Sequence, residues 1–288
     1  MRYYRPDTLT DALGWLAETS PRIAAGCTDL FPSTAAQALS GPVLDITALK
    51  DLRAITRADA TVRVGANVTW TDLVRASLPA AFDGLKAAAR EVGSIQIQNV
   101  ATLVGNICNA SPAADGIPGW LTLDARVELR STSGMRELAL ADFVLGPRKT
   151  ARRPDELVTA ILVPDTATTG RSGFMKLGAR THLVISIAMC AARIVEERGT
   201  IRDARVAVGS CSAVAQRLPA VETALIGAAA SDNASVVITD AMVQDALSPI
   251  DDLRSSAAYR ADAATELVRR TITMTLQSPE TSNRSAAA

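Results

Sequence analysis

Apolar residues recur at helical spacing near the beginning of the chain. Four of them, three or four positions apart within 9–16, predict a helix that ends before Pro21. Short apolar runs bounded by turn residues predict strands at 3–4, 22–25 and 43–46, and a second helical segment is expected to end near Gly41. The first fifty residues therefore predict a small βαβαβ unit.

The next hundred residues continue to mix helical and strand patterns. Thr69 and Asp72 have the spacing of a capped helix start, and residues 79–92 place four apolar side chains on one helical face. A short helix is expected around 119–123. Strands are predicted at 62–66, 125–130, 135–140 and 156–164.

A run of Asp, Thr, Ala and Gly at 165–170 indicates a boundary. Beyond it, strand patterns are predicted at 174–177, 182–195 and 201–208, and helical patterns at 219–226, 236–247 and 255–276. We therefore expect one domain at 1–168, with subdomains at about 1–56 and 57–168, a second domain at 169–277, and a frayed tail at 278–288.

Residues 99–124 stand out from this pattern because they are rich in small, amide, hydroxyl and acidic side chains. No long periodic apolar run fits 99–116, so the stretch is too polar for a core strand and too specific in composition for a linker. Short side chains leave backbone N–H groups accessible and let a ligand approach closely. We interpret the stretch as one wall of the binding site for an extended, phosphate-bearing cofactor.

Composition narrows the classes of partner. The chain has 288 residues, 48% of them apolar, so it can bury a sizeable core. Thirty basic and thirty acidic residues give a formal net charge of zero, which provides no electrostatic reason to expect nucleic acid or an anionic membrane. Aromatic residues make up 3%, which also argues against a surface that stacks bases.

The cysteines indicate neither a metal site nor a disulfide framework. Cys27, Cys108, Cys190 and Cys211 form no CxxC pair, and the single His182 cannot complete a zinc set, so we expect no metal in this chain. The first residues lack the apolar core of a signal peptide, and the longest apolar stretch, 183–194, is too short to span a bilayer. A soluble protein in a reducing cytoplasm fits these observations.

Two segments turn at a glycine among apolar residues, one at 24–30 and one at 102–106. A pyrophosphate needs several backbone N–H donors directed into one concavity, with hydroxyl or amide groups nearby, and both segments contain those residue types. Ordinary turns are the simpler interpretation of the residue types alone, because single-glycine turns are common. Neither segment matches the GxGxxG or GxxxxGK[ST] patterns of other nucleotide sites.

These segments resemble the FAD-binding subunit of the molybdenum hydroxylases, the family of xanthine dehydrogenase, aldehyde oxidoreductase and carbon monoxide dehydrogenase. The family pattern A-G-G-x-[DS]-L is matched at 25–30, and I-R-N-x-A-T-[IL]-G-G-N-[IL]-x-x-A-x-P-x-x-D is matched across 97–115. Residues 251–260 resemble the family's D-x-R-x-S-A-x-Y-R segment. The resemblance thus covers nearly the whole chain.

Three residues depart from the family pattern. Cys27 and Val104 stand where the family has glycine, and Gln98 stands where it has arginine. A Cβ atom restricts the backbone, so a positive φ at position 27 or 104 would require the loop to shift. These departures put the affinity for FAD in question, but not the fold.

The resemblance implies an α+β fold: two α/β subdomains of the vanillyl-alcohol-oxidase-like (PCMH-type) FAD-binding fold, followed by a C-terminal domain of sheet and helices. It implies that the backbone of 25–30 and 102–106 binds the pyrophosphate and adenosine side of FAD, while Asn109, Ser111 and Asp115 approach the ribityl chain and ring. The full set of implied cofactor contacts is Ala24, Ala25, Gly26, Cys27, Thr28, Asp29, Leu30, Ala101, Thr102, Val104, Gly105, Asn106, Asn109, Ser111, Asp115, Val158 and Lys176.

Several of these residues also have ordinary structural interpretations. Asp115 is placed as the N-cap of a short helix. Lys176 matches a family lysine on the strand that faces the flavin, where a cation stabilises the anionic reduced ring, but it also fits a solvated strand end. Arg180 is a weaker candidate of the same kind. His182 is expected to be structural, with a covalent tether to the flavin as the alternative, and Cys108 is expected to be a small core residue, with an approach to the flavin as the alternative.

The resemblance implies an oxidoreductase subunit without catalytic residues of its own. Electrons would reach its FAD from [2Fe–2S] clusters in a small partner subunit, after a large molybdopterin subunit has oxidised the substrate, and would leave to NAD⁺, oxygen or a quinone. Such heterotrimers pair into dimers. A self-contained flavin dehydrogenase or oxidase, and an assembly subunit that no longer binds FAD, remain alternatives.

Overall fold

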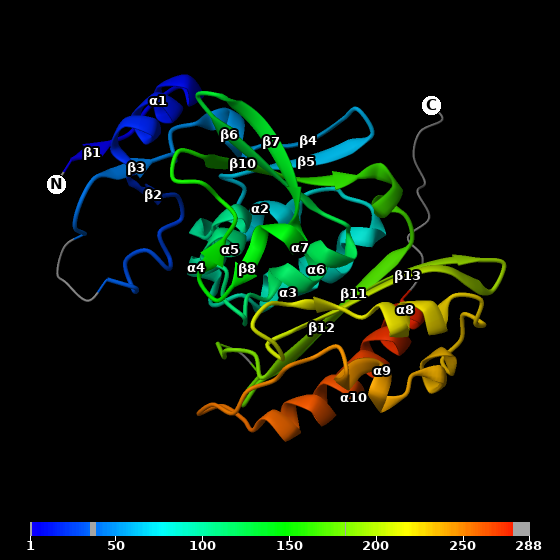
Figure 1. Cartoon of the computed structure of the whole chain (residues 1–288). Coiled ribbons are helices and arrows are strands. Elements are labelled where there is room, and N and C mark those ends of the chain that lie inside the picture. Colours follow the sequence, from blue (N-terminus) through cyan, green and yellow to red (C-terminus); the bar gives the residue numbers. More distant parts are fainter. Residues whose placement is uncertain (1, 35–38, 182, 279–288) are drawn as a thin grey trace. The chain divides into compact units, whose positions relative to one another are not determined.

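The computed structural model describes residues 2–34, 39–181 and 183–278 (Figure 1). They form two compact units, and each unit collects three separate stretches of the chain. The first unit falls within 1–76, 92–111 and 124–164, and the second within 77–91, 112–123 and 165–288. His182 and the tail from 279 onward lie outside the described residues.

A small parallel sheet opens the first unit. Its strands are β1 (Tyr3–Tyr4), β2 (Arg22–Ala24) and β3 (Val43–Asp45), in the order β1-β3-β2, and helix α1 (Leu9–Thr19) connects the first two. The predicted helix and all three strands are confirmed, and β1 lies at an edge of the sheet.

The second helix expected in this region is not found in the described residues up to 34, and residues 35–38 lie outside them. Residues 28–33 form turns instead. The hydroxyls of Ser33 and Thr34 both donate to the carbonyl of Leu30 at 3.0 Å. The backbone N–H of Ser33 also donates to the carbonyl of Asp29 at 3.0 Å, so the segment makes single turns of helical type without continuing as a helix within the described residues.

The first unit also contains a five-stranded antiparallel sheet in the order β4-β5-β10-β6-β7. Its strands are β4 (Ile55–Ala58), β5 (Thr61–Gly65), β6 (Arg126–Ser131), β7 (Gly134–Ala139) and β10 (Leu157–Pro164). The central strand β10 is buried from residue 157 to 163, as its continuous apolar run requires. Smaller elements complete the unit: η1 (Lys50–Arg53), α7 (Leu140–Phe143), β8 (Val144–Gly146) and β9 (Lys149–Thr150).

Three short helices belong to the part of the first unit that carries the sequence motifs: α2 (Trp70–Arg75), α4 (Ile95–Val100) and α5 (Leu103–Asn109). Thr69 and Asp72 form the predicted capping box of α2. The expectation of a loop at 102–106 was wrong, because Thr102 caps α5 by accepting from the backbone N–H of Gly105 at 3.0 Å. Ser94 caps α4 in the same way.

Backbone pairing fixes where α5 begins. Trp70 donates its backbone N–H to the carbonyl of Ala101 at 3.3 Å, and Leu103 donates to the carbonyl of Val68 at 3.0 Å. The buried Asn67, just before this segment, donates its side-chain amide to the carbonyls of Ile46 and Leu49. The start of α5 is therefore tied to the chain that follows β3.

The second unit is built on the antiparallel sheet β11-β12-β13-β14. Its strands are β11 (Arg171–Leu177), β12 (Ala188–Glu197), β13 (Thr200–Gly209) and β14 (Gln216–Arg217). The predicted hairpin of β12 and β13 is confirmed. The strand expected from 182 begins only at Ala188, since Leu183 has a left-handed φ of 50° and the side chain of Arg180 donates to its carbonyl.

Helices lie on both sides of the sheet that contains β12 (Figure 1), and alternate residues of β12 pack in different clusters. Ala188, Cys190 and Ala192 pack in one cluster with α10 (Ala257–Gln277), whereas Met189 and Ala191 pack in another with α3 (Asp83–Glu91). Strand residues alternate between the two faces of a sheet, so both faces of β12 are covered. The remaining elements are η2 (Ala80–Phe82), α6 (Gly116–Thr122), η3 (Asp165–Thr168), α8 (Pro219–Leu225), η4 (Ala234–Val237) and α9 (Asp240–Gln244).

Among the described residues, none of the helices combines the length and the apolar character needed to cross a membrane.

A buried ion pair at the start of β10 gives a test of the first unit. Arg136 donates to both carboxylate oxygens of Glu156, at 2.6 and 2.8 Å, and holds the pKa of Glu156 below its ordinary value. A depressed folded-state pKa stabilises the fold above the unfolded-state pKa, and this contribution is lost as the pH falls through the folded-state pKa. We expect Glu156→Gln to lower the free energy of unfolding by roughly 2 kcal/mol at pH 7, and by progressively less in acid.

Urea unfolding as a function of pH measures this difference. Glu137→Gln is the matched control, because Glu137 pairs with Arg126 on the exposed side of the neighbouring strands and should matter by less than about 0.5 kcal/mol. Equal losses in the two variants would contradict the assignment.

Candidate functional site

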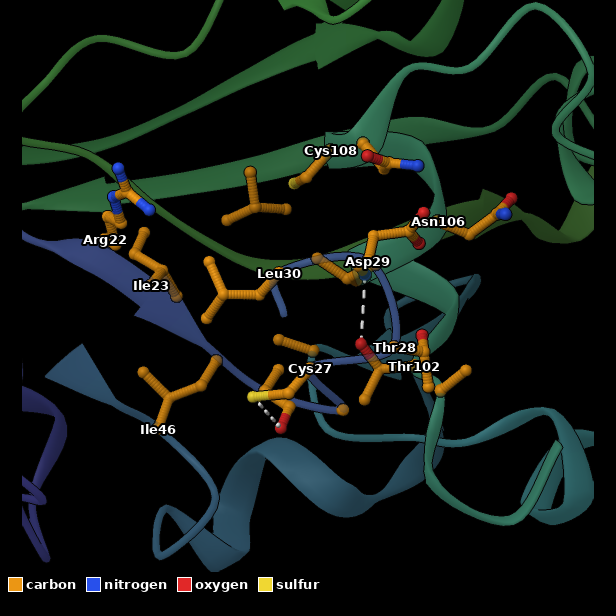
Figure 2. A pocket seen from close by; sticks show the side chains of 18 of the residues that line it. Arg22, Ile23, Cys27, Thr28, Asp29, Leu30, Ile46, Thr102, Asn106 and Cys108 are labelled. Carbon is orange, nitrogen blue, oxygen red and sulfur yellow. Dashed lines mark hydrogen bonds between the residues drawn. The ribbon is translucent and has the colours of Figure 1, made fainter. Parts of the chain in front are cut away.

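A pocket of about 610 Å³ in the first unit brings together the two segments singled out in the sequence. Its wall is formed by the turn after β2, by α5 with the residues before it, and by the first residues of β10 (Figure 2). Ligand pockets in proteins span about 300–1,000 Å³, so this cavity is large enough for a sizeable small molecule.

The two segments meet because Gly26 has no side chain. A Cβ atom built on Gly26 would lie 2.1 Å from the carbonyl oxygen of Val100 and 2.8 Å from the Cα of Ala101. No side chain fits at such distances, so the approach of the two backbones requires glycine at this position. The first turn and the start of α5 thereby become two walls of one pocket.

Cys27, next to Gly26, adopts a left-handed backbone with φ of 58°. Its thiol is half-buried in the pocket wall and donates to the carbonyl of Ala25 at 3.4 Å. Burial raises the pKa of this thiol above its ordinary value. Val104, the other departure from the family pattern, lies within α5 and has no positive φ, so only position 27 has the backbone that favours glycine.

The hydroxyl and amide side chains of the wall gather on one side of the pocket, and two isoleucines lie toward the other side, where Arg22 also lies. Figure 2 shows Thr28, Thr102 and Asn106 gathered on one side, with Ile23 and Ile46 toward the other. The side-chain oxygen Oδ1 of Asn106 is buried and has no hydrogen-bond partner among the described residues. A buried polar atom of this kind normally has a partner, so its place in the pocket wall indicates that a bound molecule supplies one.

Most of the implied cofactor contacts fall in this pocket. They are Ala25, Gly26, Cys27, Thr28, Asp29, Leu30, Ala101, Thr102, Val104, Gly105, Asn106, Asn109 and Val158. Ala24 and Ser111 do not line it. Asp115 and Lys176 belong to the second unit and are described below.

Sequence reasoning missed other residues of the wall. These are Pro21, Arg22, Ile23, Ser33, Ile46, Ala66, Trp70, Val92, Ile97, Cys108, Arg152 and Leu157. Cys108, expected in the core, is half-buried and lines the pocket, although burial raises the pKa of its thiol to about 12. The position of Cys108 between Asn106 and Asn109 was the one signal available for it.

Asp115 and Lys176 form a buried ion pair in the second unit. The ammonium group of Lys176 lies 2.8 Å from Oδ2 of Asp115, and the two side chains are 7% and 10% exposed. Lys176 is therefore not the solvated strand-end residue that was one of its two interpretations. Burial raises the pKa of Asp115 above its ordinary value, while the charge of Lys176 opposes this shift.

Three further residues can now be placed. Asp115 precedes α6, yet its side chain makes no capping hydrogen bond, so the structure does not support the N-cap interpretation. Gln98, which replaces the family arginine, donates its side-chain amide to the carbonyl of Val92 at 3.1 Å. Arg180 is exposed and donates to the carbonyl of Leu183 within its own loop.

Comparison with known proteins decides the family. Residues 1–166 match the model of the FAD binding domain in molybdopterin dehydrogenase, and residues 174–275 match the CO dehydrogenase flavoprotein C-terminal domain. The chain belongs to this family of FAD-binding flavoprotein subunits. This confirms the resemblance inferred from the sequence and identifies FAD as the cofactor of the N-terminal domain.

Curated relatives agree along nearly the whole chain. The xanthine dehydrogenase FAD-binding subunit of Escherichia coli O157:H7 is 30% identical over 275 residues, which cover 94% of each chain. The nicotine 6-hydroxylase medium subunit of Paenarthrobacter nicotinovorans is also 30% identical over 275 residues, covering 94% of this chain and 96% of the relative. These relatives are subunits of oxidoreductases.

Among solved structures, carbon monoxide dehydrogenase from Hydrogenophaga pseudoflava matches with a TM-score of 0.87 at 26% identity and covers 96% of each chain. The predicted class of fold, an FAD-binding domain followed by a C-terminal domain of sheet and helices, is thereby confirmed.

The two departures at glycine positions predict opposite effects. Cys27→Gly removes a Cβ from a left-handed backbone and should raise the free energy of unfolding by about 1 kcal/mol. It should also tighten FAD binding a few-fold, because it removes from the pocket wall a side chain that the family pattern lacks at this position. Val104→Gly places glycine inside α5 and should lower the free energy of unfolding by at least about 1 kcal/mol.

Urea unfolding and FAD titration of both variants measure these effects. A gain of stability in Val104→Gly, or a loss in Cys27→Gly, would contradict the backbone argument.

Proposed function

We propose that the chain is the FAD-carrying electron-transfer subunit of a molybdopterin- and iron–sulfur-containing dehydrogenase. The observation that carries the proposal is that residues of both family motifs, 25–30 and 101–109, line one pocket. The matches at 1–166 and 174–275 support a division into an FAD-binding domain at 1–168 and a second domain at 169–277.

The pocket fits one part of FAD by its chemistry. The hydroxyls of Thr28 and Thr102 and the amide NH2 of Asn106 can donate to the pyrophosphate. The unpartnered Oδ1 of Asn106 only accepts, so it suits a hydroxyl or amine of the adenosine part of FAD. Ile23 and Ile46 offer an apolar surface for the adenosine. Arg22 and Arg152 are the cations of this wall and favour an anionic ligand.

Asn109 and Ser111 of the first unit are proposed to contact the ribityl chain and the ring, and for Asp115 and Lys176 the resemblance to the family alone supports such a role. When bound, FAD supplies one- and two-electron redox chemistry. No base is needed from this chain for the transfer of electrons.

The partners and the acceptor are proposed from the family. A large molybdopterin subunit and a small [2Fe–2S] subunit would complete a heterotrimer that pairs into a dimer, and NAD⁺, oxygen or a quinone would accept the electrons. A reducing cytoplasm is proposed as the compartment of the chain from the spacing of the four cysteines in the sequence.

The direct test is titration of the purified chain with FAD, followed by its visible spectrum. We expect saturable binding, and we expect Asn106→Leu to weaken it by about three- to tenfold through the loss of one hydrogen bond. The unfolding midpoint without FAD should not fall, because the substitution removes an unpartnered buried carbonyl.

Asn233→Leu is the control, because Asn233 is exposed and belongs to the second unit. A chain that binds no FAD, even with its partner subunits present, would favour the assembly-subunit alternative. Turnover of a small substrate by the isolated chain would favour a self-contained flavin enzyme.

Thiol labelling gives a second test that does not depend on activity. Cys27 is half-buried, whereas Cys190 and Cys211 are buried and burial raises their pKa values to about 12 and about 11. Thiolates are the reactive species, so Cys27 should react first with a disulfide reagent at pH 8. Saturating FAD should slow this reaction at least several-fold, and an unchanged labelling rate would place the ligand elsewhere.

A further inference from the structure

The short hairpin of β8 and β9 is fastened to the C-terminal end of α5 within the first unit. Its turn residue Arg148 has a left-handed φ of 59° and donates its backbone N–H to the carbonyl of Ala110 at 2.9 Å. Ala110 ends α5 with a left-handed φ of 47°. At the base of the hairpin, the carbonyl of the buried Phe143 accepts from the backbone N–H of Ala151 at 2.8 Å. Backbone hydrogen bonds therefore fix Arg148 relative to the helix end.

The side chain of Arg148 returns to the same helix end. Its guanidinium donates to the side-chain oxygen Oδ1 of Asn109, the last residue of α5. An asparagine amide has one oxygen that accepts and one NH2 group that donates, and the two lie on different sides of the carboxamide carbon. Because Arg148 occupies Oδ1, the NH2 group of Asn109 points away from the guanidinium, and none of the described residues accepts from it.

Asn109 is also a residue of the pocket wall. Thr102 caps the other end of α5 and lines the same pocket, beside the backbone that Gly26 approaches. At 1.5 Å per residue, the seven residues of α5 separate the two ends by about 10 Å along the helix axis. An extended cofactor whose pyrophosphate lies near Thr102 therefore meets Asn109 with a different part of the molecule.

Two asparagines of α5 thus present different groups to a ligand. Oδ1 of Asn106 is buried without a hydrogen-bond partner among the described residues, whereas Oδ1 of Asn109, one turn later, is occupied. Asn106 keeps an acceptor for the ligand, and Asn109 keeps donors. The hydroxyls of the ribityl chain and the carbonyls of the flavin ring are acceptors that suit the donors of Asn109.

We propose that Arg148 is a positioning residue for the cofactor: by holding Oδ1 of Asn109, it directs the NH2 group of Asn109 at the flavin half of FAD. The proposal rests on the proposed function. Without the side chain of Arg148, the amide of Asn109 is free to rotate and to present its oxygen to the cofactor instead. Only one of the two orientations then makes the hydrogen bond, so the affinity for FAD falls.

The first measurement is the dissociation constant of the full-length chain for FAD. Arg148→Gly removes the side chain from a left-handed backbone that favours glycine, so the unfolding midpoint should not fall. We expect this variant to bind FAD about three- to tenfold more weakly, as for the loss of one hydrogen bond.

Lys149→Met is the matched control for charge. Lys149 is the neighbouring cation of the same hairpin, it is exposed, and its side chain makes no hydrogen bond or ion pair with the described residues. This variant should keep the wild-type affinity for FAD. An equal loss of affinity in Lys149→Met and Arg148→Gly would show that charge alone matters, and would overturn the positioning role.

Binding of ADP distinguishes positioning from a general loosening of the pocket. ADP lacks the ribityl chain and the flavin ring, so Arg148→Gly should leave the dissociation constant for ADP unchanged. Equal weakening of ADP and FAD would overturn the assignment of Asn109 to the flavin half.

A double-mutant cycle tests whether Arg148 acts through Asn109. Asn109→Ala should weaken FAD binding, and adding Arg148→Gly should then weaken it no further, because no amide is left to position. Additive losses in the double variant would overturn the proposal. If Arg148→Gly does not fold, as judged by thermal unfolding, Arg148→Met takes its place, because methionine keeps an aliphatic stem but has no donor.

The outcomes separate this proposal from the one beneath it. A wild-type chain that does not bind FAD overturns the proposed function and this inference together. A wild-type chain that binds FAD, with the same dissociation constant in Arg148→Gly, overturns only the role of Arg148.

Discussion

The close approach of Gly26 to the backbone of Val100 and Ala101 is the contact on which the pocket depends. Any side chain at this position would collide with the carbonyl of Val100, so the two walls would have to separate. Other hydrogen bonds hold the remaining parts of the pocket wall in place. Asn67 and the backbone pairing of Trp70 and Leu103 hold the start of α5 in place, and Arg136 with Glu156 holds the start of β10.

The second unit contains a buried ion pair, formed by Lys176 and Asp115. Removing Lys176 and Asp115 from water has a large unfavourable free energy, and their attraction offsets it only if the remaining hydrogen-bonding groups are also satisfied. Ser186 satisfies one of those groups. Removing one partner alone would leave an uncompensated buried charge, so each of the two side chains depends on the other.

Sequence reasoning succeeded where the signals were local. The capping box of Thr69 and Asp72 and the apolar run of β10 each lie within a few residues, and both were predicted correctly. It failed at α4 and α5, because helices of six and seven residues are too short to show a full apolar period. Their caps, Ser94 and Thr102, were the signal that could have revealed them.

No local sequence pattern could have predicted the hydrogen-bond partners of Asp115. Ser186 is 71 residues away and Lys176 is 61 residues away, so only the tertiary fold brings the three together. Resemblance to the family named two of these residues, but it named neither Ser186 nor the hydrogen bonds that join them. The wall residues Arg22, Cys108 and Arg152 were missed for the same reason, since each faces the pocket only after the strands and helices have assembled.

The position of α3 and α6 in the chain has a consequence for synthesis on the ribosome. Both helices precede the strands they pack against, and Gly84 of α3 donates its backbone N–H to Ser172, on a strand that is made much later. At roughly 5–20 residues per second, the 87 residues that follow Thr122 at the end of α6 up to Gly209 at the end of β13 take roughly 4–17 s to translate. During that interval the apolar sides of both helices lack their sheet, so this flavoprotein should depend on chaperones early, before its last third has been made.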